Sequence, residues 1–281
     1  MKLLRYGPAG AEKPGVVADD GTIRDLSGVI SDISSDTLGP ELFATLFKTD
    51  ASSLPEVPAG TRIGPCVGDP GKILCIGLNY SDHAAETGAT PPTEPIIFHK
   101  SLTSLCGPYD NVEKPRGSEA LDWEVELAIV IGKRAKYISE DEVMNHIAGF
   151  AVFNDVSERD YQIKRQGSWT KGKSHDTFGP LGPWLVTPDE VADVHNLPMW
   201  LDVNGEKRQR GNTNTLIFNV PTIVSYVSQF MTLMPGDIIP TGTPPGVAMG
   251  MKPEPKYLQV GDVITLGIDG LGEQRQTVVA A

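Results

Sequence analysis

The sequence contains little cysteine and no long apolar run, and both absences narrow the classes of protein that it can encode. Its three cysteines, Cys66, Cys75 and Cys106, are odd in number and lack the close spacing of a cysteine-based zinc site, so free thiols in a reducing compartment are expected. No stretch of about 18 apolar residues could span a membrane, and the first residues lack the apolar core of a signal peptide. We therefore expect a cytoplasmic protein with no membrane partner.

Positive charge is also scarce. The 281 residues include 24 lysines and arginines against 36 aspartates and glutamates, which gives a formal net charge of −12. Nucleic acids carry the same sign of charge, so we expect no nucleic-acid partner. A small anionic substrate stays compatible with this charge, because a metal ion and a few lysines can make one pocket locally positive.

Glycine and proline, in contrast, are frequent, with 30 and 23 residues clustered between short apolar runs. This pattern favours a β-rich fold with many turns. Residues 1–65 are predicted to form a small α/β module, with a strand at 1–6 and a helix at 40–47. Residues 66–281 are predicted to form the main domain, an α+β unit rich in strands that opens with an apolar strand at 72–77.

The most informative segment is the apolar run over residues 121–132, which carries two glutamates two residues apart. Side chains alternate along a strand, so Glu124 and Glu126 should point to one side and Trp123 into a core on the other. Two like charges on a buried face require a positive partner, and carboxylate oxygens favour a hard divalent cation such as Mg²⁺, Mn²⁺ or Ca²⁺. The alternative is an edge strand whose two glutamates are solvated.

A third carboxylate follows a second apolar strand. The run over residues 148–153 ends in Asn154-Asp155, where an aspartate suits a third metal ligand from a neighbouring strand. Asp155 could instead belong to a turn or cap the helix predicted to start over residues 157–162, since aspartate favours both places. The three carboxylates together strengthen the metal interpretation, because each explains the burial of the others.

Two further residues have the spacing of a catalytic pair. His83 and Glu86 lie three residues apart in a segment predicted to be a short helix that ends at Gly88, so they share one face. A carboxylate next to an imidazole orients the ring and raises its basicity, as a general base requires. The alternative is an ion pair on the surface of the helix.

Two glycine-containing loops could bind a substrate oxygen. Lys171 and Lys173 lie in the segment 167–180, where a lysine could bind a carboxylate or an enolate oxygen; a solvated loop lysine is the alternative. Gly242 and Thr243 could offer a backbone N–H and a hydroxyl to an oxyanion, or simply form a turn. The segment 167–180 lacks the spacing of a phosphate-binding P-loop.

Taken in order, these residues form motifs that resemble those of the fumarylacetoacetate hydrolase family. The motifs are Gly-Leu-Asn-Tyr-x-x-His-x-x-Glu (77–86), Asp-Trp-Glu-Val-Glu-Leu (122–127), Phe-Asn-Asp-Val-Ser-x-Arg-Asp-x-Gln (153–162), Lys-Gly-Lys-Ser-x-Asp-Thr-Phe-Gly-Pro (171–180) and Thr-Gly-Thr-Pro-Pro-Gly-Val (241–247). The resemblance extends over about residues 72–279, and residues 1–65 are similar to the less constant N-terminal module of bacterial members.

The resemblance implies a mixed β-roll around a Mg²⁺ or Mn²⁺ site, with Glu124, Glu126 and Asp155 as the metal ligands. It also implies that His83 activates water with Glu86 as its partner, on a lid that orders over the substrate. The other residues that it places in the pocket are Lys173, Arg159, Gln162, Gly242 and Thr243. A homodimer is implied as well. Little apolar surface is available to hold residues 80–93 in place, so this lid is expected to be mobile without substrate.

The activity implied by the resemblance is metal-dependent hydrolysis of a carbon–carbon bond in a 2,4-diketo acid of the acylpyruvate type, giving pyruvate and a hydroxy acid. The opening Lys-Leu-Leu-Arg-Tyr-Gly-Pro and the later Gly-Met-Lys-Pro resemble hydrolases of 2,4-diketo-3-deoxy-L-rhamnonate or L-fuconate, which predicts a role in sugar-acid catabolism. Alternatives that use the same metal and enolate chemistry are an oxaloacetate decarboxylase, a tautomerase and a ureidoglycolate lyase-like enzyme. A binding module with a structural cation is the non-catalytic alternative.

Overall fold

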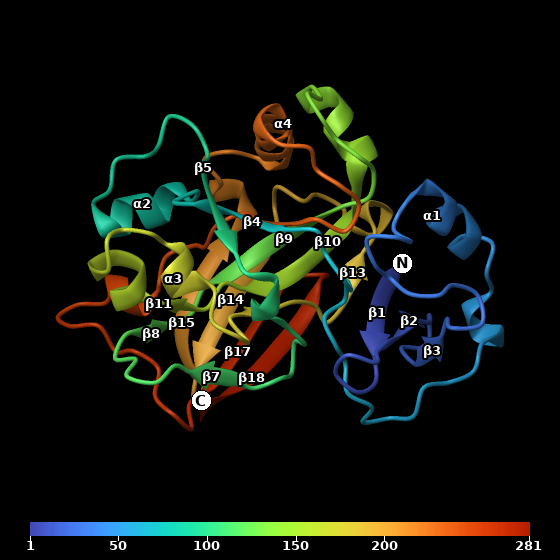
Figure 1. Cartoon of the computed structure of the whole chain (residues 1–281), viewed down its shortest axis with the longest axis horizontal. Helices are drawn as coiled ribbons and strands as arrows, with labels where there is room; N and C mark the ends of the chain where they lie inside the picture. Colours follow the sequence, from blue (N-terminus) through green and yellow to red (C-terminus); the bar gives the residue numbers. More distant parts are fainter.

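The computed structural model describes residues 1–281, and most of its strands form two sheets. The strands of the larger sheet are β1 (Lys2–Tyr6), β2 (Lys13–Val17), β3 (Ile23–Asp25), β4 (Ile73–Gly77), β5 (Ile96–Lys100), β9 (Val125–Ile131), β10 (Ile147–Asn154), β13 (Leu185–Val186) and β16 (Ile238–Pro240). They lie in the order β3-β2-β1-β13-β10-β9-β16-β4-β5. Figure 1 shows the N-terminal strands β1 to β3 at one end of the molecule.

The smaller sheet has five strands in the order β15-β14-β17-β18-β7. Their bounds are β7 (Val112–Lys114), β14 (Pro198–Val203), β15 (Glu206–Asn212), β17 (Val263–Ile268) and β18 (Gly272–Ala280). Strands β14 and β15 form a hairpin, whose Asn204-Gly205 turn has positive φ at both residues, as a tight hairpin turn of this type requires. Two short pairs complete the strand pairing, β8 (Leu121–Asp122) with β11 (Ser157–Glu158) and β6 (Leu105–Cys106) with β12 (Gly179–Pro180).

Helices are few and short. The α-helices are α1 (Pro40–Leu46), α2 (Ser81–Thr87), α3 (Thr170–Lys173) and α4 (Val220–Phe230). One π-helical turn, η4 (Asp160–Lys164), precedes α3. The 3₁₀ turns are η1 (Ala51–Ser53), η2 (Leu102–Ser104), η3 (Glu140–His146), η5 (Pro188–Glu190), η6 (Thr213–Thr215) and η7 (Ala248–Gly250). The expected β-rich, mixed architecture is therefore confirmed.

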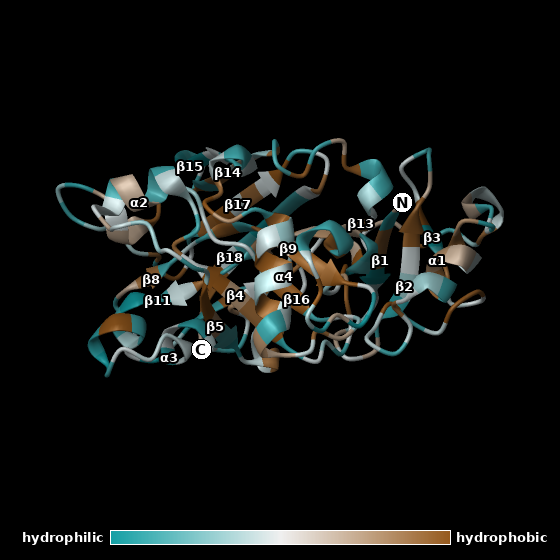
Figure 2. Cartoon of the chain, turned by 90° about the horizontal axis from the view of Figure 1, so that it is seen from above, coloured by the Kyte–Doolittle hydropathy of each residue, from teal (hydrophilic) through white to brown (hydrophobic).

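The central strand β9 is buried on both faces, which explains its nearly unbroken apolar sequence. Leu127 and Ile129 pack in one hydrophobic core and Ala128 and Val130 in another, because successive side chains of a strand point to opposite faces. Trp123 also lies in the first core, as predicted. Figure 2 shows the hydrophobic residues concentrated in central strands such as β4 and β9.

The N-terminal strands continue the larger sheet, because β1 pairs with β13 on one side and with β2 on the other. Leu3 and Leu42 share a hydrophobic core with Ile73 and Val130. The strand and the helix predicted for this region are confirmed. The domain boundary at residue 65 stays a prediction.

The strand predicted over residues 121–132 is interrupted, and this is the main local difference from the sequence prediction. Its first part, β8, pairs with β11, whereas β9 begins at Val125 and pairs with β10. Glu124 therefore lies where the chain changes its pairing partner. The helix predicted from residue 157 begins later, at Asp160, because the two residues of β11 belong to this short sheet.

Helix α4 buries only part of its apolar stripe. Ile223, Val224 and Val227 are buried, but Phe230 is 63% exposed. Phe230 is the last residue of the helix, and its ring packs edge-on against Tyr226 with the ring centres 4.9 Å apart.

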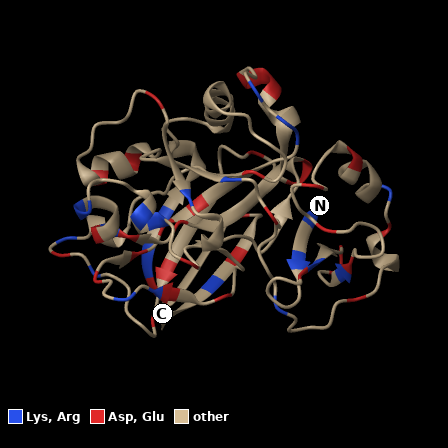
Figure 3. Ribbon diagram, in the orientation of Figure 1, with Lys and Arg blue, Asp and Glu red and all other residues tan.

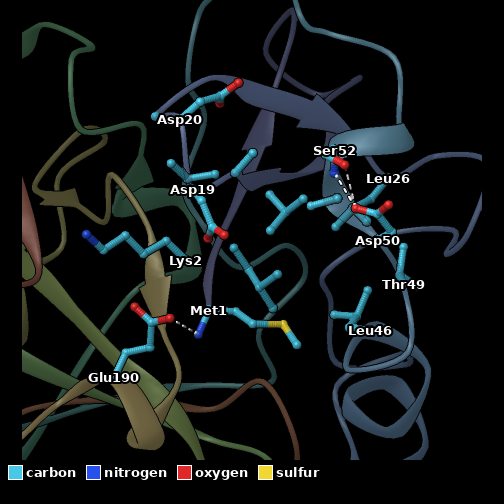
Figure 4. A pocket seen from close by; sticks show the side chains of 16 residues that line it. Met1, Lys2, Asp19, Asp20, Leu26, Leu46, Thr49, Asp50, Ser52 and Glu190 are labelled. Atoms are coloured by element: carbon cyan, nitrogen blue, oxygen red, sulfur yellow. Dashed lines mark hydrogen bonds and ion pairs between the residues drawn. The ribbon is translucent and has the colours of Figure 1, made fainter.

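No helix of the structure has both the length and the apolar character needed to cross a bilayer. Figure 3 shows acidic and basic residues distributed over the whole ribbon. A cavity of about 700 Å³ lies in the N-terminal region between β1, β2 and the segment after α1, lined by Leu3, Val16, Leu26, Asp50 and Glu190 among others. Figure 4 shows its acidic rim, and none of the predicted site residues lines it.

Candidate metal centre and its lid

The three predicted carboxylates come together in one buried cluster. Glu124 precedes β9, Glu126 lies within it, and Asp155 follows the adjacent strand β10. One oxygen from each of the three side chains lies within 4.8 Å of the other two, and all three residues are less than 10% exposed. The alternative of solvated glutamates is therefore wrong. The cluster is compact enough for three ligands to bind one ion.

Three buried cations surround these carboxylates. The Nζ atom of Lys173 lies 2.8 Å from Glu124 Oε2 and 2.7 Å from Asp155 Oδ2. The Nζ atom of Lys100 lies 2.5 Å from Asp155 Oδ1. Arg159 Nη2 lies 2.6 Å from Glu124 Oε1, close but without hydrogen-bond alignment. Charge pairing of this kind is what makes the burial of so many ionised groups tolerable.

The electrostatic environment shifts the pKa values of the two glutamates in opposite directions. Burial raises the pKa of Glu124, but the charges of Lys173 and Arg159 outweigh burial and hold that pKa at about 2. Burial and the charges of Asp155 and Glu124 raise the pKa of Glu126 well above its ordinary value. Glu126 is thus the carboxylate of the cluster whose charge is least compensated by the protein itself.

The residues fit a divalent cation. Glu126 accepts one hydrogen bond, from the Gly242 N–H at 2.9 Å, and forms no ion pair. Its remaining lone pairs, together with oxygens of Glu124 and Asp155, make an all-carboxylate donor set that suits a hard ion. A cation bound there would remove the like-charge repulsion that the two lysines leave uncompensated.

Glycine at position 172 is required for the lysine to reach the cluster. Lys173 ends α3, which packs against η4 and β11. A Cβ atom on Gly172 would lie 2.4 Å from the Glu158 carbonyl oxygen and 2.5 Å from the Gln162 amide nitrogen. The close approach allowed by Gly172 brings α3 near enough for Lys173 to enter the buried site, so the solvated-loop alternative does not apply to this lysine.

His83 and Glu86 are confirmed as neighbours on one helix. Both lie in α2, which ends at Gly88 with a left-handed φ of 67°, and His83 Nδ1 is 3.0 Å from Glu86 Oε2. The imidazole is buried, with 8% of the residue exposed. A carboxylate at Nδ1 favours the tautomer that carries its proton there, which leaves Nε2 free to accept a proton.

The loop over residues 241–250 connects the helix to the carboxylates. The Gly246 N–H lies 3.1 Å from Glu86 Oε1 and 3.2 Å from Oε2, while the Gly242 N–H donates to Glu126. Gly242 has φ of 100°, and a Cβ there would lie 2.9 Å from the Cβ of Asn79. The His83–Glu86 pair and the carboxylate cluster are therefore both hydrogen-bonded to this one loop, and α2 packs against it.

The remaining predicted pocket residues are buried near the cluster, but their polar groups are engaged within the protein. Arg159 Nη1 donates to Gln162 Oε1 at 3.1 Å. The Thr243 hydroxyl donates to the Val125 carbonyl oxygen at 2.9 Å, and the Gly242 N–H donates to Glu126 instead of facing open space. Substrate contacts for these residues stay a prediction.

The sequence prediction missed three polar residues that complete the site. Lys100 pairs with Asp155, and Asp122 pairs with Arg159. Gln209 accepts a hydrogen bond from the Val125 N–H and donates to Thr243 and Pro244. Lys100 and Gln209 lie in ordinary-looking strands, and Asp122 stands beside the more conspicuous Glu124 and Glu126, so none of the three has a local signal of its role.

Comparisons with known proteins identify the origin of these motifs. A family model described as the C-terminal domain of fumarylacetoacetate hydrolase matches residues 72–279. A relative from Burkholderia multivorans is 54% identical over 281 residues, covering 100% of both chains, and bears the provisional name of a hydrolase with no substrate stated.

Three solved structures share the fold over 100% of this chain. A fumarylacetoacetate hydrolase from Exiguobacterium antarcticum is 35% identical, with a TM-score of 0.88 and all of its chain covered. A maleylpyruvate hydrolase from Sphingobium, solved with manganese(II) and pyruvate, is 30% identical, with a TM-score of 0.83 and all of its chain covered. A 2-hydroxyhepta-2,4-diene-1,7-dioate isomerase from Mycobacterium marinum is 32% identical, with a TM-score of 0.78 and 98% covered.

Proposed function

Because the chain belongs to the fumarylacetoacetate hydrolase family, we propose that it is a metal-dependent hydrolase of carbon–carbon bonds in 2,4-diketo acids of the acylpyruvate type. The observation that carries this proposal is the buried Glu124–Glu126–Asp155 cluster, connected through one loop to the His83–Glu86 pair. The maleylpyruvate hydrolase relative, with its manganese ion and pyruvate, supports a keto-acid substrate and a divalent cation.

The three carboxylates are proposed to hold Mg²⁺, with Mn²⁺ or Ca²⁺ as alternatives. When bound, such an ion supplies a Lewis acid for a substrate oxo group and a template for the substrate carboxylate. The buried ammonium of Lys173 lies against two of the three carboxylates. It is therefore placed beside the ion, where it can stabilise negative charge that develops on a substrate oxygen.

The reaction that these side chains support is a hydrolytic cleavage. His83 accepts a proton from water at Nε2, because Nδ1 faces Glu86, and the water oxygen adds to the distal carbonyl carbon of the diketo acid. The bond between that carbon and the methylene carbon breaks, and its electron pair forms the enolate of pyruvate. Lys173 stabilises the enolate oxygen, and the proton that His83 took from water is returned to the methylene carbon, which gives pyruvate and a second acid. Arg159 and Gln162 are proposed to face the substrate.

We propose 2,4-diketo-3-deoxy-L-rhamnonate or L-fuconate as the substrate, giving pyruvate and a hydroxy acid. Support comes from the resemblance of the Lys2–Pro8 and Gly250–Pro253 segments to hydrolases of these sugar acids. Decarboxylation and tautomerisation pass through the same kind of enolate, and the isomerase among the structural relatives makes isomerisation the alternative to test.

The products decide among these reactions. The purified protein with Mg²⁺ is incubated with a panel of acylpyruvates, the two diketo sugar acids and oxaloacetate, and the products are identified by mass spectrometry. We expect pyruvate and a second acid in equal amounts, and no turnover after chelation of the metal. Release of CO₂ would indicate a decarboxylase, and an isomer of unchanged mass would indicate a tautomerase; either result contradicts hydrolysis.

We propose that residues 80–93 act as a lid. The first turn of helix α2 is held by hydrogen bonds of Ser81 and Asp82 with Thr215, and Glu86 contacts the loop at Gly246. Residues 85–88 are exposed, so few contacts hold the second half of the helix closed. Binding of oxalate with Mg²⁺ is expected to slow amide exchange over residues 80–93, because the ligand adds contacts only to the closed state. The amides of α4 serve as the internal control and should not respond. Equal exchange with and without oxalate would exclude a substrate-ordered lid.

A cytoplasmic homodimer is the remaining part of the proposal. The three cysteines are free and buried, which agrees with a reducing compartment. Phe230 and Tyr137, at 63% and 66% exposed, are apolar groups that a second copy of the chain could cover. The molecular mass in solution, measured by light scattering, distinguishes the dimer from a monomer.

A further inference from the structure

Asp122 is a buried carboxylate that bridges two parts of the site. It ends β8 and is fully buried. Its Oδ1 accepts hydrogen bonds from the Trp123 and Ala248 amides, each at 2.8 Å. Its Oδ2 accepts from the Met249 amide at 3.1 Å and from Arg159 Nε at 2.8 Å. Four donors from three separate segments therefore converge on one side chain.

On one side, Asp122 fixes the part of the loop that receives the lid. Ala248 and Met249 belong to the turn η7, which directly follows the Gly246 amide that donates to Glu86. Trp123 Nε1 donates to the Gly246 carbonyl oxygen at 3.1 Å. Residues 122 and 123 thus form hydrogen bonds with this loop, and so does Glu86 on the helix that carries His83.

On the other side, Asp122 fixes the orientation of a guanidinium that contacts a metal ligand. A guanidinium is planar, so holding Arg159 at Nε determines where its other nitrogens lie. Nη2 then lies 2.6 Å from Glu124 Oε1, and Nη1 contacts Gln162. Asp122 also supplies negative charge that competes with Glu124 for the same cation.

We propose that Asp122 is a positioning residue that couples the docking of the lid to the alignment of the metal ligands. This inference rests on the proposed metal and lid functions. If Asp122 is replaced by Asn, Arg159 retains only Glu124 as a carboxylate partner. The guanidinium is then drawn toward Glu124, where it competes with a bound metal ion for that carboxylate. The Met249 amide loses an acceptor in the same change, so the loop that receives Glu86 is loosened.

The test compares Asp122→Asn with a matched control, Asp237→Asn. Asp237 is also fully buried, forms an ion pair with Lys72 and accepts from the Met234 amide, but lies outside the site. Both variants lose a buried charge pair and should unfold at a lower temperature. Calorimetry with Mn²⁺ and amide exchange over residues 80–93, with Mn²⁺ and oxalate, are measured on each full-length protein.

We expect Asp122→Asn to bind Mn²⁺ about 10–100-fold more weakly, the range found when a residue that supports a metal ligand is changed. It should also lose most of the oxalate-induced protection of the lid at saturating Mn²⁺. Asp237→Asn should retain both properties. Wild-type values in Asp122→Asn, or a change in only one of the two, would overturn the coupling. If the wild-type protein binds no Mn²⁺ and shows no protection, the proposed function itself fails.

A second variant keeps the charges intact. Ala248 is the first residue of η7, where proline is tolerated, and Val247 has φ of −68° and ψ of 152°, as the residue before a proline prefers. Ala248→Pro therefore removes one loop N–H from Asp122 without changing any side chain of the cluster. Coupling predicts weaker Mn²⁺ binding, by about 10-fold, the lower end of the range above, together with reduced lid protection. Unchanged Mn²⁺ affinity with a loosened lid would overturn the proposal.

Discussion

Glu126→Gln is expected to abolish divalent-cation binding and hydrolysis together. Gln has the same shape but supplies no charge, and Glu126 is the cluster carboxylate that forms no ion pair with the protein. Loss of a direct ligand should reduce Mg²⁺ affinity by about 100-fold or more, since changes to supporting residues alone cost about 10–100-fold. Activity should fall in the same proportion at limiting metal concentration.

Isothermal calorimetry with Mg²⁺ or Mn²⁺ measures the affinity, and Glu113→Gln is the matched control. Glu113 lies in β7 and is exposed, so its neutralisation should leave both affinity and turnover unchanged. An Mg²⁺ affinity of Glu126→Gln equal to that of the wild type would mean that the metal site is assigned to the wrong residues.

Removal of the metal should destabilise the wild-type protein and leave the stability of Glu126→Gln unchanged. A cation that binds only the folded state stabilises it by about 2.7 kcal/mol at 100 times its dissociation constant, so chelation should lower the unfolding temperature of the wild type. Glu126→Gln should show no such shift. Without metal it should be at least as stable as the wild type, because the substitution removes a buried charge and its repulsion with Asp155 and Glu124, the causes that raise the pKa of Glu126.

The parts of the site that could be predicted are those determined by local geometry. The alternation of side chains placed Glu124 and Glu126 together even though the predicted strand is interrupted at residues 123–124. The three-residue spacing of His83 and Glu86 needs only one turn of helix to be correct. Asp155 was ambiguous alone; it lies buried beside the two glutamates, and its role as a metal ligand stays a prediction.

The parts that could not be predicted depend on contacts between distant segments. Lys100 reaches Asp155 because β5 and β10 belong to one sheet with three strands between them, and no local pattern gives that order. Asp122 pairs with Arg159 only because β8 leaves the main sheet and pairs with β11. Phe230 has the spacing of a core residue, but the helix ends there and leaves it exposed.

The Gly242–Thr243 loop is another case in which the sequence indicates the local conformation but not the contacts. Its sequence indicates a stiff turn, and the turn is present, with positive φ at Gly242. Which acceptor each donor meets depends on the strand beside it: the Gly242 amide donates to Glu126, and the Thr243 hydroxyl donates to Val125. The loop supports the strand that carries the metal ligands, a role that composition and spacing do not distinguish from direct contact with substrate.

His83→Ala is expected to lower turnover by about 10²–10⁴-fold, the usual contribution of a general base, while metal affinity stays unchanged. The partner of the imidazole is Glu86, at 3.0 Å from Nδ1, and no ion pair connects His83 to Glu124, Glu126 or Asp155. The loss should therefore appear in the chemical step, measured as kcat under saturating Mg²⁺, and not in binding of the ion.

Two further variants distinguish the loss of the general base from the loss of lid closure. Glu86→Gln keeps an oxygen that can accept from the Gly246 amide but removes the negative charge beside His83 Nδ1, so its kcat should fall less than that of His83→Ala. His99→Ala changes an exposed histidine on β5 and should leave turnover intact. If His83→Ala hydrolyses at a near-normal rate while oxalate still protects residues 80–93, the imidazole does not activate water, and the proton must be accepted by another group beneath the lid.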